Sequence, residues 1–472
     1  MQKVTRYSAL TAACLVLAGC ASVGMEQAIE DTNSQRNSFT QGKLELSRTA
    51  EQQEARRKLS NELLAEPLRM DDAVQLALAN SPAVQALLAQ SWADMAQARQ
   101  TGRIANPIFS FERVRAGDEL ELGRLLSFGL LDLLTLPHRQ AISRGQVAQA
   151  KVQLSANVVE QVTQVRQAWV RAVAAQQNLH YANQVNRTAQ ASAELARRMQ
   201  QVGNFTKLQR IRQQSFYADS AAQLALAQHA ATASREELVR QLGLSDSQAT
   251  QLKLPERLPD LPKEARPVAV VNTSATEQRL DVQMARNQLD IAGKSQGLNL
   301  LTSLVDVELG LRRDTEFNNS KGTSTPRKGF ELDIRLPLFD WGNVQRDAMN
   351  AQSLAAANRY DNTVRTASSQ LRESYSAYRT AYDVAAHYRD EIVPLRKTMA
   401  EENLLRYNGM LIGVFELLAD TRDQINSVMA AINASQQFWL ADAALAASLT
   451  GRPAAATTLS SSAGSAAAAA AH

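Results

Sequence analysis

The sequence has few of the residues that thiol-based, metal and histidine-dependent sites need. It contains 2 cysteines and 5 histidines in 472 residues. The histidines are isolated from one another, and no HExxH, GxSxG, Walker or glycine-rich dinucleotide motif occurs. The methionines are dispersed rather than arranged in a ladder. We therefore expect no catalytic residues, no metal site and no cofactor.

Aromatic residues and net charge are also scarce. Phe, Trp and Tyr make up 5% of the chain, and the net charge is +4. So small a charge gives no reason to expect nucleic acid as a partner. Ala, Gln, Leu and Arg dominate instead, and these residues favour long helices.

The N-terminus is typical of a secreted lipoprotein. Lys3 and Arg6 precede an apolar stretch, Tyr7–Leu17, that is too short to span a bilayer. The following Leu17-Ala18-Gly19-Cys20 resembles the bacterial lipobox, which predicts a signal peptide at 1–19 and lipidation of Cys20. Ala21 implies export to the outer membrane, because lipoproteins retained in the inner membrane carry Asp there. An ordinary signal peptide that contains a cysteine is the alternative.

The remaining sequence repeats itself at an interval of about 206 residues. In each copy an alternating stretch leads into a long helical run, which breaks at a glycine and returns. Matching positions are Leu126, Gln146, Ala150 and Gly203 in the first copy, and Leu332, Gln352, Ala356 and Gly409 in the second. The predicted domains are a lipidated linker at 20–66, repeat 1 at 67–254, a proline-rich linker at 255–275, repeat 2 at 276–451 and a disordered Ala/Ser-rich tail at 452–472.

Four stretches alternate between apolar and other residues, which predicts β-strands. They are 108–114, 120–128, 304–312 and 330–338. In the last, Phe330 to Leu338 places apolar residues on one face and Glu331, Asp333 and Arg335 on the other. A length of about 9 residues matches a tilted membrane-spanning strand. Soluble hairpins packed on helices are the alternative, which the regularly charged face argues against.

The helical runs have heptad-like spacing, which predicts side-by-side packing as coiled coils. The stretch 138–202 lacks proline and would be about 97 Å long if unbroken. A single amphipathic helix is expected at 70–99, some helix at 44–64, and a kink at Pro394. The predicted seams are Val158, Val162, Val165, Trp169 and Ala172 with Leu208, Ile211, Ser215, Ala218, Ala222 and Ala225; and Leu371, Ser374, Tyr378, Ala381, Ala385, Tyr388, Ile392 and Leu395 with Ile425, Val428, Ile432, Ser435, Trp439, Asp442, Ala446 and Leu449.

Four strands are too few to close a membrane barrel, since the smallest have about eight. Open strand edges cannot sit in lipid, because each unpaired backbone group costs several kcal/mol. If these strands enter a membrane, several chains must share one barrel. Three chains would contribute twelve strands.

These features together resemble the TolC-type outer-membrane efflux proteins, most closely the lipidated branch that serves resistance-nodulation-division pumps. The resemblance covers about residues 67–451 and includes Asn80-Ser81-Pro82 and Leu336-Pro337-Leu338-Phe339-Asp340-Trp341-Gly342. It implies a mainly α fold with β-strands, in which a homotrimer shares a 12-stranded β-barrel in outer-membrane lipid and a periplasmic α-helical barrel. It also implies contact with a periplasmic adaptor and, through it, with an inner-membrane pump.

The resemblance further implies docking of the adaptor at the two helical turns. Arg198, Val202, Gly203 and Thr206 match the family pattern of the first turn. The second turn has Gly409 and Gly413 but carries Leu404 where the pattern has Arg. A reversal between long helices needs a residue with positive φ, so glycines that only make turns are the alternative.

Glu416 and Asp420 follow the second turn and lie one helical turn apart on one face. In the family, acidic rings near this position narrow the periplasmic entrance, which predicts a gate; a solvated helix face is the alternative. A second functional class, a lipidated periplasmic adaptor, would show one hairpin between β-rich halves rather than two hairpins. The exported substrate stays open between organic toxicants, drugs and metal ions.

Overall fold

The computed structural model describes residues 23–117, 119–268, 276–302, 306–318, 322–335 and 341–452. The chain forms two compact units. Unit 1 comprises residues 1–26, 89–154 and 280–366, and unit 2 comprises 27–88, 155–279 and 367–472. The predicted signal peptide, the lipidation site Cys20, residues 336–340 of the Leu-Pro-Leu-Phe motif and the tail beyond Arg452 lie outside the described residues.

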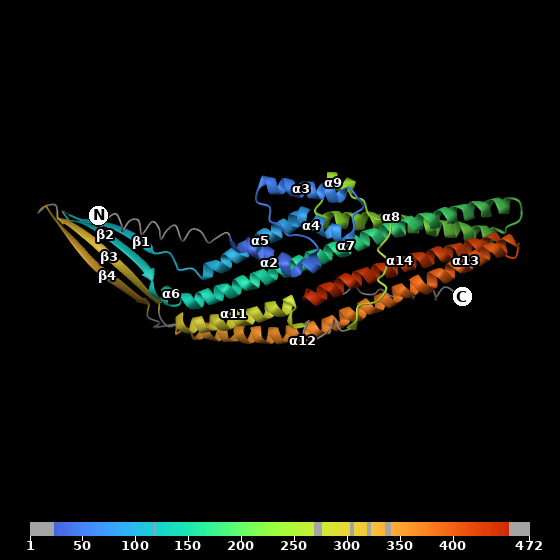
Figure 1. Cartoon of the computed structure of the whole chain (residues 1–472). Coiled ribbons are helices and arrows are strands. Elements are labelled where there is room, and N and C mark those ends of the chain that lie inside the picture. The colour runs from blue at the N-terminus through green and yellow to red at the C-terminus, as the bar shows by residue number, and fades with distance from the viewer. Residues whose placement is uncertain are drawn as a thin grey trace. The chain divides into compact units, whose positions relative to one another are not determined.

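Unit 1 contains an antiparallel sheet with the strand order β1-β2-β3-β4 (Figure 1). Its strands are β1 (Ile108–Ala116), β2 (Glu119–Gly129), β3 (Asp306–Asn318) and β4 (Thr323–Arg335). All four predicted strands are confirmed, although β4 begins seven residues earlier than 330. The extension contains Pro326, which a strand at the edge of a sheet tolerates.

The pairing of β2 with β3 joins the two repeats in one sheet. Within the described residues, β1 and β4 each have one neighbouring strand, so each leaves one edge unpaired. Apolar side chains on one face are strongly exposed: Phe109 is 64% exposed and Phe330 is 78% exposed. An isolated chain therefore presents both open edges and an uncovered apolar surface.

Helices complete unit 1. They are α6 (Leu130–Leu134), α11 (Leu280–Thr302), most of α5 (Pro82–Thr101), and the first parts of α7 (Leu136–Gln201) and α12 (Asn343–His387). Helices α7 and α11 approach closely, because a Cβ built at Gly145 would lie 3.0 Å from Cγ1 of Ile291.

The first helical hairpin of unit 2 consists of α7, which has 66 residues in all, and α8 (Lys207–Leu242). Side-chain contacts join the two antiparallel helices. They include an ion pair of 2.6 Å between Arg171 and Glu237 and a hydrogen bond of 3.2 Å from Asn186 to Ser220. A short helix, α9 (Asp246–Gln251), follows.

The residues of the predicted seam of the first hairpin are buried on α7 but exposed on α8, so the expected pairing of the two sets is wrong. Residues Val158, Val162, Val165, Trp169 and Ala172 are all buried. On α8 the predicted seam, Leu208, Ile211, Ser215, Ala218, Ala222 and Ala225, is exposed, and the buried residues are Ser220, Leu238, Val239 and Leu242. Alanines occur on several faces of α8, so its heptad spacing does not single out one face.

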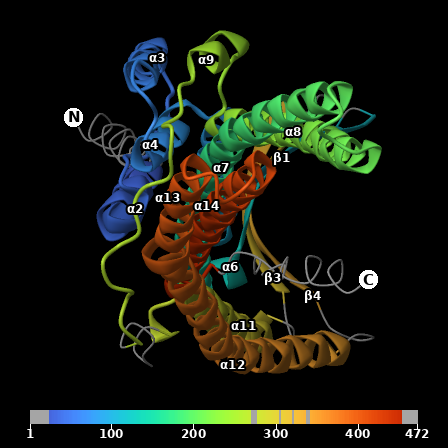
Figure 2. The same ribbon diagram turned by 90° about the vertical axis from the view of Figure 1, so that its right-hand side faces the viewer.

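The second hairpin consists of α12, a π-helical turn η2 (Tyr388–Ile392), α13 (Val393–Asn408) and α14 (Val414–Thr450), as Figure 2 shows. Its core confirms much of the predicted α12 seam but moves the α14 seam by about one position. The core residues are Leu371, Tyr378, Ala381, Tyr382 and Ala385 with Ala434, Phe438, Ala441 and Leu445.

The interruption expected at Pro394 is the π-helical turn. The backbone N–H of Val393 donates to the carbonyl of Tyr388, five residues back. Pro394 has no N–H to donate, and its ring would clash with a regular helical carbonyl. The wider π-helical turn just before the proline leaves room for its ring and does not need its missing N–H.

The N-terminal part of unit 2 has more helix than the sequence predicted. It contains most of α2 (Val23–Thr40), together with α3 (Ala50–Leu64) and α4 (Met70–Asn80). Helix α2 was not predicted, because its polar sequence has no clear period. The single helix expected at 70–99 is wrong: Pro82 forces the preceding residue into an extended conformation, so α4 ends and α5 begins there.

The predicted proline-rich linker contains no α-helix or strand over its described part, 255–268. Side chains of the second hairpin hold it. Tyr382 donates to the carbonyl of Lys263 over 2.9 Å, and Trp439 donates to that of Pro259 over 3.2 Å. The hydroxyl of Tyr378 accepts from the N–H of Arg266 over 3.1 Å.

Among the described helices, none has the length and apolar character needed to cross a membrane.

Candidate docking site at the helical turns

The structure brings the two predicted turns together within unit 2. The rings of Phe205, in the first turn, and Phe415, just after the second, have centroids 4.4 Å apart. Behind them the guanidinium of Arg422 lies 5.3 Å from the ring centroid of Phe216, joining α14 to α8. The two turns therefore lie side by side at one end of the helical hairpins (Figure 1).

The first turn ends α7 in a Schellman motif. The N–H of Asn204 donates to the carbonyl of Met199 over 2.9 Å, and the N–H of Gly203 donates to that of Gln200 over 3.0 Å. Gly203 has φ +82°, a conformation that glycine adopts without steric cost. Thr206 then starts α8 with a capping box, in which its side chain accepts from the N–H of Gln209.

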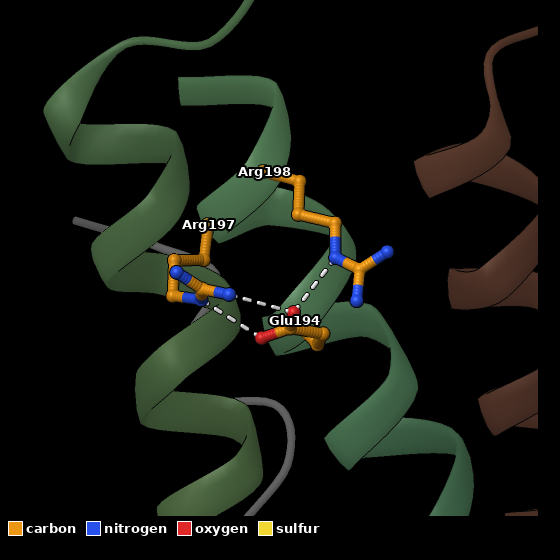
Figure 3. Close-up of polar contacts among 3 residues, drawn as sticks. All are labelled: Glu194, Arg197 and Arg198. Atoms are coloured by element: carbon orange, nitrogen blue, oxygen red, sulfur yellow. Dashed lines mark hydrogen bonds and ion pairs between the residues drawn. The ribbon is translucent and has the colours of Figure 1, made fainter. Parts of the chain in front are cut away.

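Arg198 is held by a residue that the sequence analysis missed. Its Nε donates to Glu194 over 2.7 Å, while Arg197 donates to both oxygens of the same carboxylate at 2.8 Å (Figure 3). These hydrogen bonds, from Arg197 first and then Arg198, lower the pKa of Glu194 to about 2. The spacing of a Glu three and four residues before two arginines was the available signal.

The second turn has the same hydrogen-bond pattern but a different residue in the left-handed conformation. The N–H of Leu411 donates to the carbonyl of Arg406 over 2.8 Å, and that of Met410 donates to Tyr407 over 2.9 Å. Met410 has φ +60°, whereas Gly409 has φ −79°. The expected need for glycine at 409 is therefore wrong, because α13 runs one residue too far for Gly409 to occupy the left-handed position.

Gly413 starts α14, but its extended backbone has no side-chain cap. The surface near both turns is apolar and open. Val202 is 70% exposed, Met410 93% and Leu411 74%. Exposed apolar groups that cluster on one surface are typical of protein interaction sites.

The two acidic residues of the predicted gate lie in the first two turns of α14. The carboxylate of Asp420 accepts a hydrogen bond from the side-chain amide of Asn403 on α13, and Asp420 is half-buried. Glu416 is exposed, and its N–H donates to the carbonyl of Gly413 over 3.1 Å. A single chain contains no ring of acids, so the gate stays a prediction.

The described part of the chain has no cluster of three or more His, Cys, Asp or Glu that could hold a metal ion. Two of the histidines contact nearby side chains: His180 hydrogen-bonds with Gln184 on α7, and His387 at the end of α12 lies 3.2 Å from the carboxylate of Glu391 in η2.

Residues 272–451 match the family model described as outer membrane efflux protein. The chain thus contains an outer membrane efflux protein domain. This match confirms the resemblance to the outer membrane efflux protein family for residues 272–451, which include the second strand pair and the second helical hairpin.

Solved structures extend the likeness beyond the efflux protein domain. The outer membrane protein VceC from Vibrio cholerae matches with a TM-score of 0.66 and 17% identity, covering 81% of this chain and 96% of that one. The CmeC outer membrane channel of Campylobacter jejuni matches with a TM-score of 0.65 and 15% identity, covering 84% and 86%. A membrane protein from Pseudomonas aeruginosa matches with a TM-score of 0.66 and 19% identity, covering 84% and 93%. At such identities the likeness establishes the fold. No curated protein sequence matches the chain.

Proposed function

We propose that the chain is one subunit of a homotrimeric outer-membrane efflux channel. The channel is a passive conduit that exports toxic compounds or metal ions delivered by an inner-membrane pump. The efflux protein domain at 272–451 and the fold shared with VceC and CmeC support this assignment.

The observation that carries the proposal is the open amphipathic sheet. Within the described residues, β1 and β4 leave their outer edges unpaired, and the apolar face is uncovered. In lipid each unpaired backbone group costs several kcal/mol, so the edges must pair with copies of the same sheet. Three chains contribute twelve strands, which is an even number that closes with a water-filled interior.

The two helical turns would contact the periplasmic adaptor. Arg198, Val202, Gly203 and Thr206 form the first contact, and Gly409 with Gly413 forms the second. Their common surface, joined by the two phenylalanine rings and flanked by exposed Val202 and Leu411, supports this role. The adaptor links the channel to the pump.

The sequence at the N-terminus supports anchoring by lipid on Cys20 after removal of residues 1–19. The protein would then reside in the outer membrane, with its two helical repeats, 67–254 and 276–451, extending into the periplasm. Glu416 and Asp420 would form acidic rings at the periplasmic entrance.

The trimer is tested by detergent extraction of the full-length protein, chemical cross-linking and gel migration with and without heating. A heat-sensitive species of three cross-linked chains is expected, together with stepwise conductance in planar phosphatidylcholine bilayers. A monodisperse monomer that does not insert would overturn the proposal.

The gate is tested by recording Glu416→Gln with Asp420→Asn in the same bilayers. Cation block or conductance should change, because the entrance loses its carboxylates. The matched control is Asp219→Asn with Glu236→Gln, two exposed acids of α8 away from the turns. Unchanged behaviour of the first double variant would remove these residues from the gate.

A further inference from the structure

In the sheet of unit 1 the carboxylates lie on one face only, whereas basic side chains lie on both faces. Alternation along each strand and the cross-strand register assign every residue to one of two faces. The apolar face also carries the basic residues Arg113, Arg115, Arg124, Arg313 and Lys328. The opposite face carries the acids Glu112, Glu119, Glu121, Glu308, Asp314, Glu316, Glu331 and Asp333. Among the described strand residues, no carboxylate lies on the apolar face.

Three of these basic residues form a row across the sheet. Arg124 of β2 is directly opposite Arg313 of β3, and Arg313 is directly opposite Lys328 of β4. Like charges at directly opposite positions destabilise a sheet. Arg313 and Lys328 are exposed and Arg124 is half-buried. An anion bound along the row would offset this repulsion.

The basic residues of the opposite face show the contrast. Arg312 lies 2.8 Å from Asp314 and also approaches Glu112 and Glu331, at 3.9 and 3.8 Å. Arg327 pairs with Glu316 at 2.6 Å. Gly123 of β2 is opposite both Glu112 of β1 and Asp314 of β3. Because glycine has no side chain, Arg312 of β3 can reach across β2 toward Glu112. On the polar face the sheet thus supplies counter-ions, and for the basic row it supplies none within the described residues.

The basic row lies at the border of the apolar band. The next row on the same face, away from the strand hairpins, consists of Phe109, Leu126, Leu311 and Phe330. Toward the hairpin ends at Gly117 and Gly322, the last two rows of this face are mixed. They consist of Arg113, Leu122, Thr315 and Pro326, and of Arg115, Leu120, Phe317 and Ser324. In a membrane barrel, the level at which the wholly apolar rows give way to such mixed rows lies near the lipid headgroups.

We propose that the row of Arg124, Arg313 and Lys328 binds the phosphate groups of lipids in the outer leaflet. The inference rests on the proposed function, since the apolar face meets lipid only if the sheet is part of a membrane barrel with its helices in the periplasm. Guanidinium groups recognise phosphate in a bidentate manner, and the lysine adds a point charge. Bound phosphate offsets the repulsion along the row.

The test compares lipid retention by the full-length protein. The protein is reconstituted into phosphatidylcholine vesicles that contain either bisphosphorylated or dephosphorylated lipid A, and then extracted for native mass spectrometry. We expect the wild type to retain the phosphorylated lipid preferentially. The triple variant Arg124→Gln, Arg313→Gln and Lys328→Gln should bind it about a hundredfold more weakly, at about fivefold per basic residue.

Two control variants make the result specific. Arg312→Gln with Arg327→Gln removes basic charge from the opposite face and should leave lipid preference unchanged. Arg124→Lys with Arg313→Lys keeps the charge and should retain most of the preference, even if the glutamine variant does not fold. Equal retention of the two lipids by an inserted, conducting wild type would overturn the phosphate site alone. Failure of the wild type to insert would overturn both this site and the proposed channel.

Discussion

The two helical turns reach the same geometry with different residues. Both end their first helix in a Schellman motif, with matching hydrogen bonds to the carbonyls of Met199 and Arg406. The left-handed residue is Gly203 in the first turn and Met410 in the second. Gly409 aligns with Gly203 in the repeat but lies one position too early. The two turns thus share one hydrogen-bond geometry although the helix before the second turn ends one residue later relative to the aligned glycine.

The difference predicts unequal stability. A left-handed conformation costs a residue with a side chain about 1–2 kcal/mol relative to glycine. The first turn also begins its second helix with the capping box of Thr206, whereas the second begins with Gly413 and no side-chain cap. We therefore expect the second turn to open more readily than the first.

The largest effect should come from exchanging the left-handed residues. Met410→Gly should stabilise the second turn by about 1–2 kcal/mol, and Gly203→Ala should destabilise the first by a similar amount. Hydrogen exchange of peptides covering each turn measures both. Gly409→Ala is the control, because its φ of −79° suits alanine, with 3.5 Å to the nearest atom. Equal effects at 409 and 410 would contradict the comparison.

The next largest effect should be the free-energy coupling between the two turns through the contact of Phe205 with Phe415. Phe205→Ala and Phe415→Ala each remove the ring contact, and the double variant should show a coupling of about 0.5–1.5 kcal/mol. The measurement is the same hydrogen exchange at both turns, arranged as a double-mutant cycle. Additive effects would mean that the turns open independently.

Changes to the residues that cap α8 and α14 should have a smaller effect on the stability of the turns. Thr206→Ala should destabilise the start of α8 by about 1 kcal/mol, since it removes an oxygen that accepts a backbone hydrogen bond. Gly413→Ser should stabilise the start of α14 by a few tenths of a kcal/mol, about the difference between serine and glycine as caps, with Glu416 at the position that completes a capping box. Exchange rates of the first-turn amides of each helix distinguish these outcomes.

A change of pH near neutrality is expected to have the smallest effect on the stability of the first turn. Because the arginines hold the pKa of Glu194 at about 2, below the ordinary value of 4.5, its contribution to stability is fully present above pH 4.5. It is lost as the pH falls toward 2. Protection of the first turn, corrected for intrinsic exchange, should not change between pH 8 and 5, and the wild type and Glu194→Gln should converge near pH 2. A difference that disappears already at pH 5 would show that the carboxylate is not held by the arginines.

The candidate site was only partly predictable. The positions of both turns followed from glycines that interrupt long helical runs, and Thr206 followed from its match to the family pattern of the first turn. Glu194 was detectable from its spacing to Arg197 and Arg198 but lacked a functional reason to be chosen. The contact of Phe205 with Phe415 joins residues from different repeats, so no local pattern could indicate it.

By itself the sequence determined the local structure: four alternating strands, the long α7, the duplicated order and the buried stripe from Val158 to Ala172. The backbone geometry makes side chains return to the same face every 2 residues in a strand and every 3.6 residues in a helix, so the sequence pattern reveals both. Only the tertiary structure decided which face of alanine-rich α8 packs on α7, the shift of the α14 core to Phe438, the pairing of β2 with β3 and the choice of Met410. These depend on which surfaces meet, and an alanine-rich helix offers several nearly equivalent surfaces.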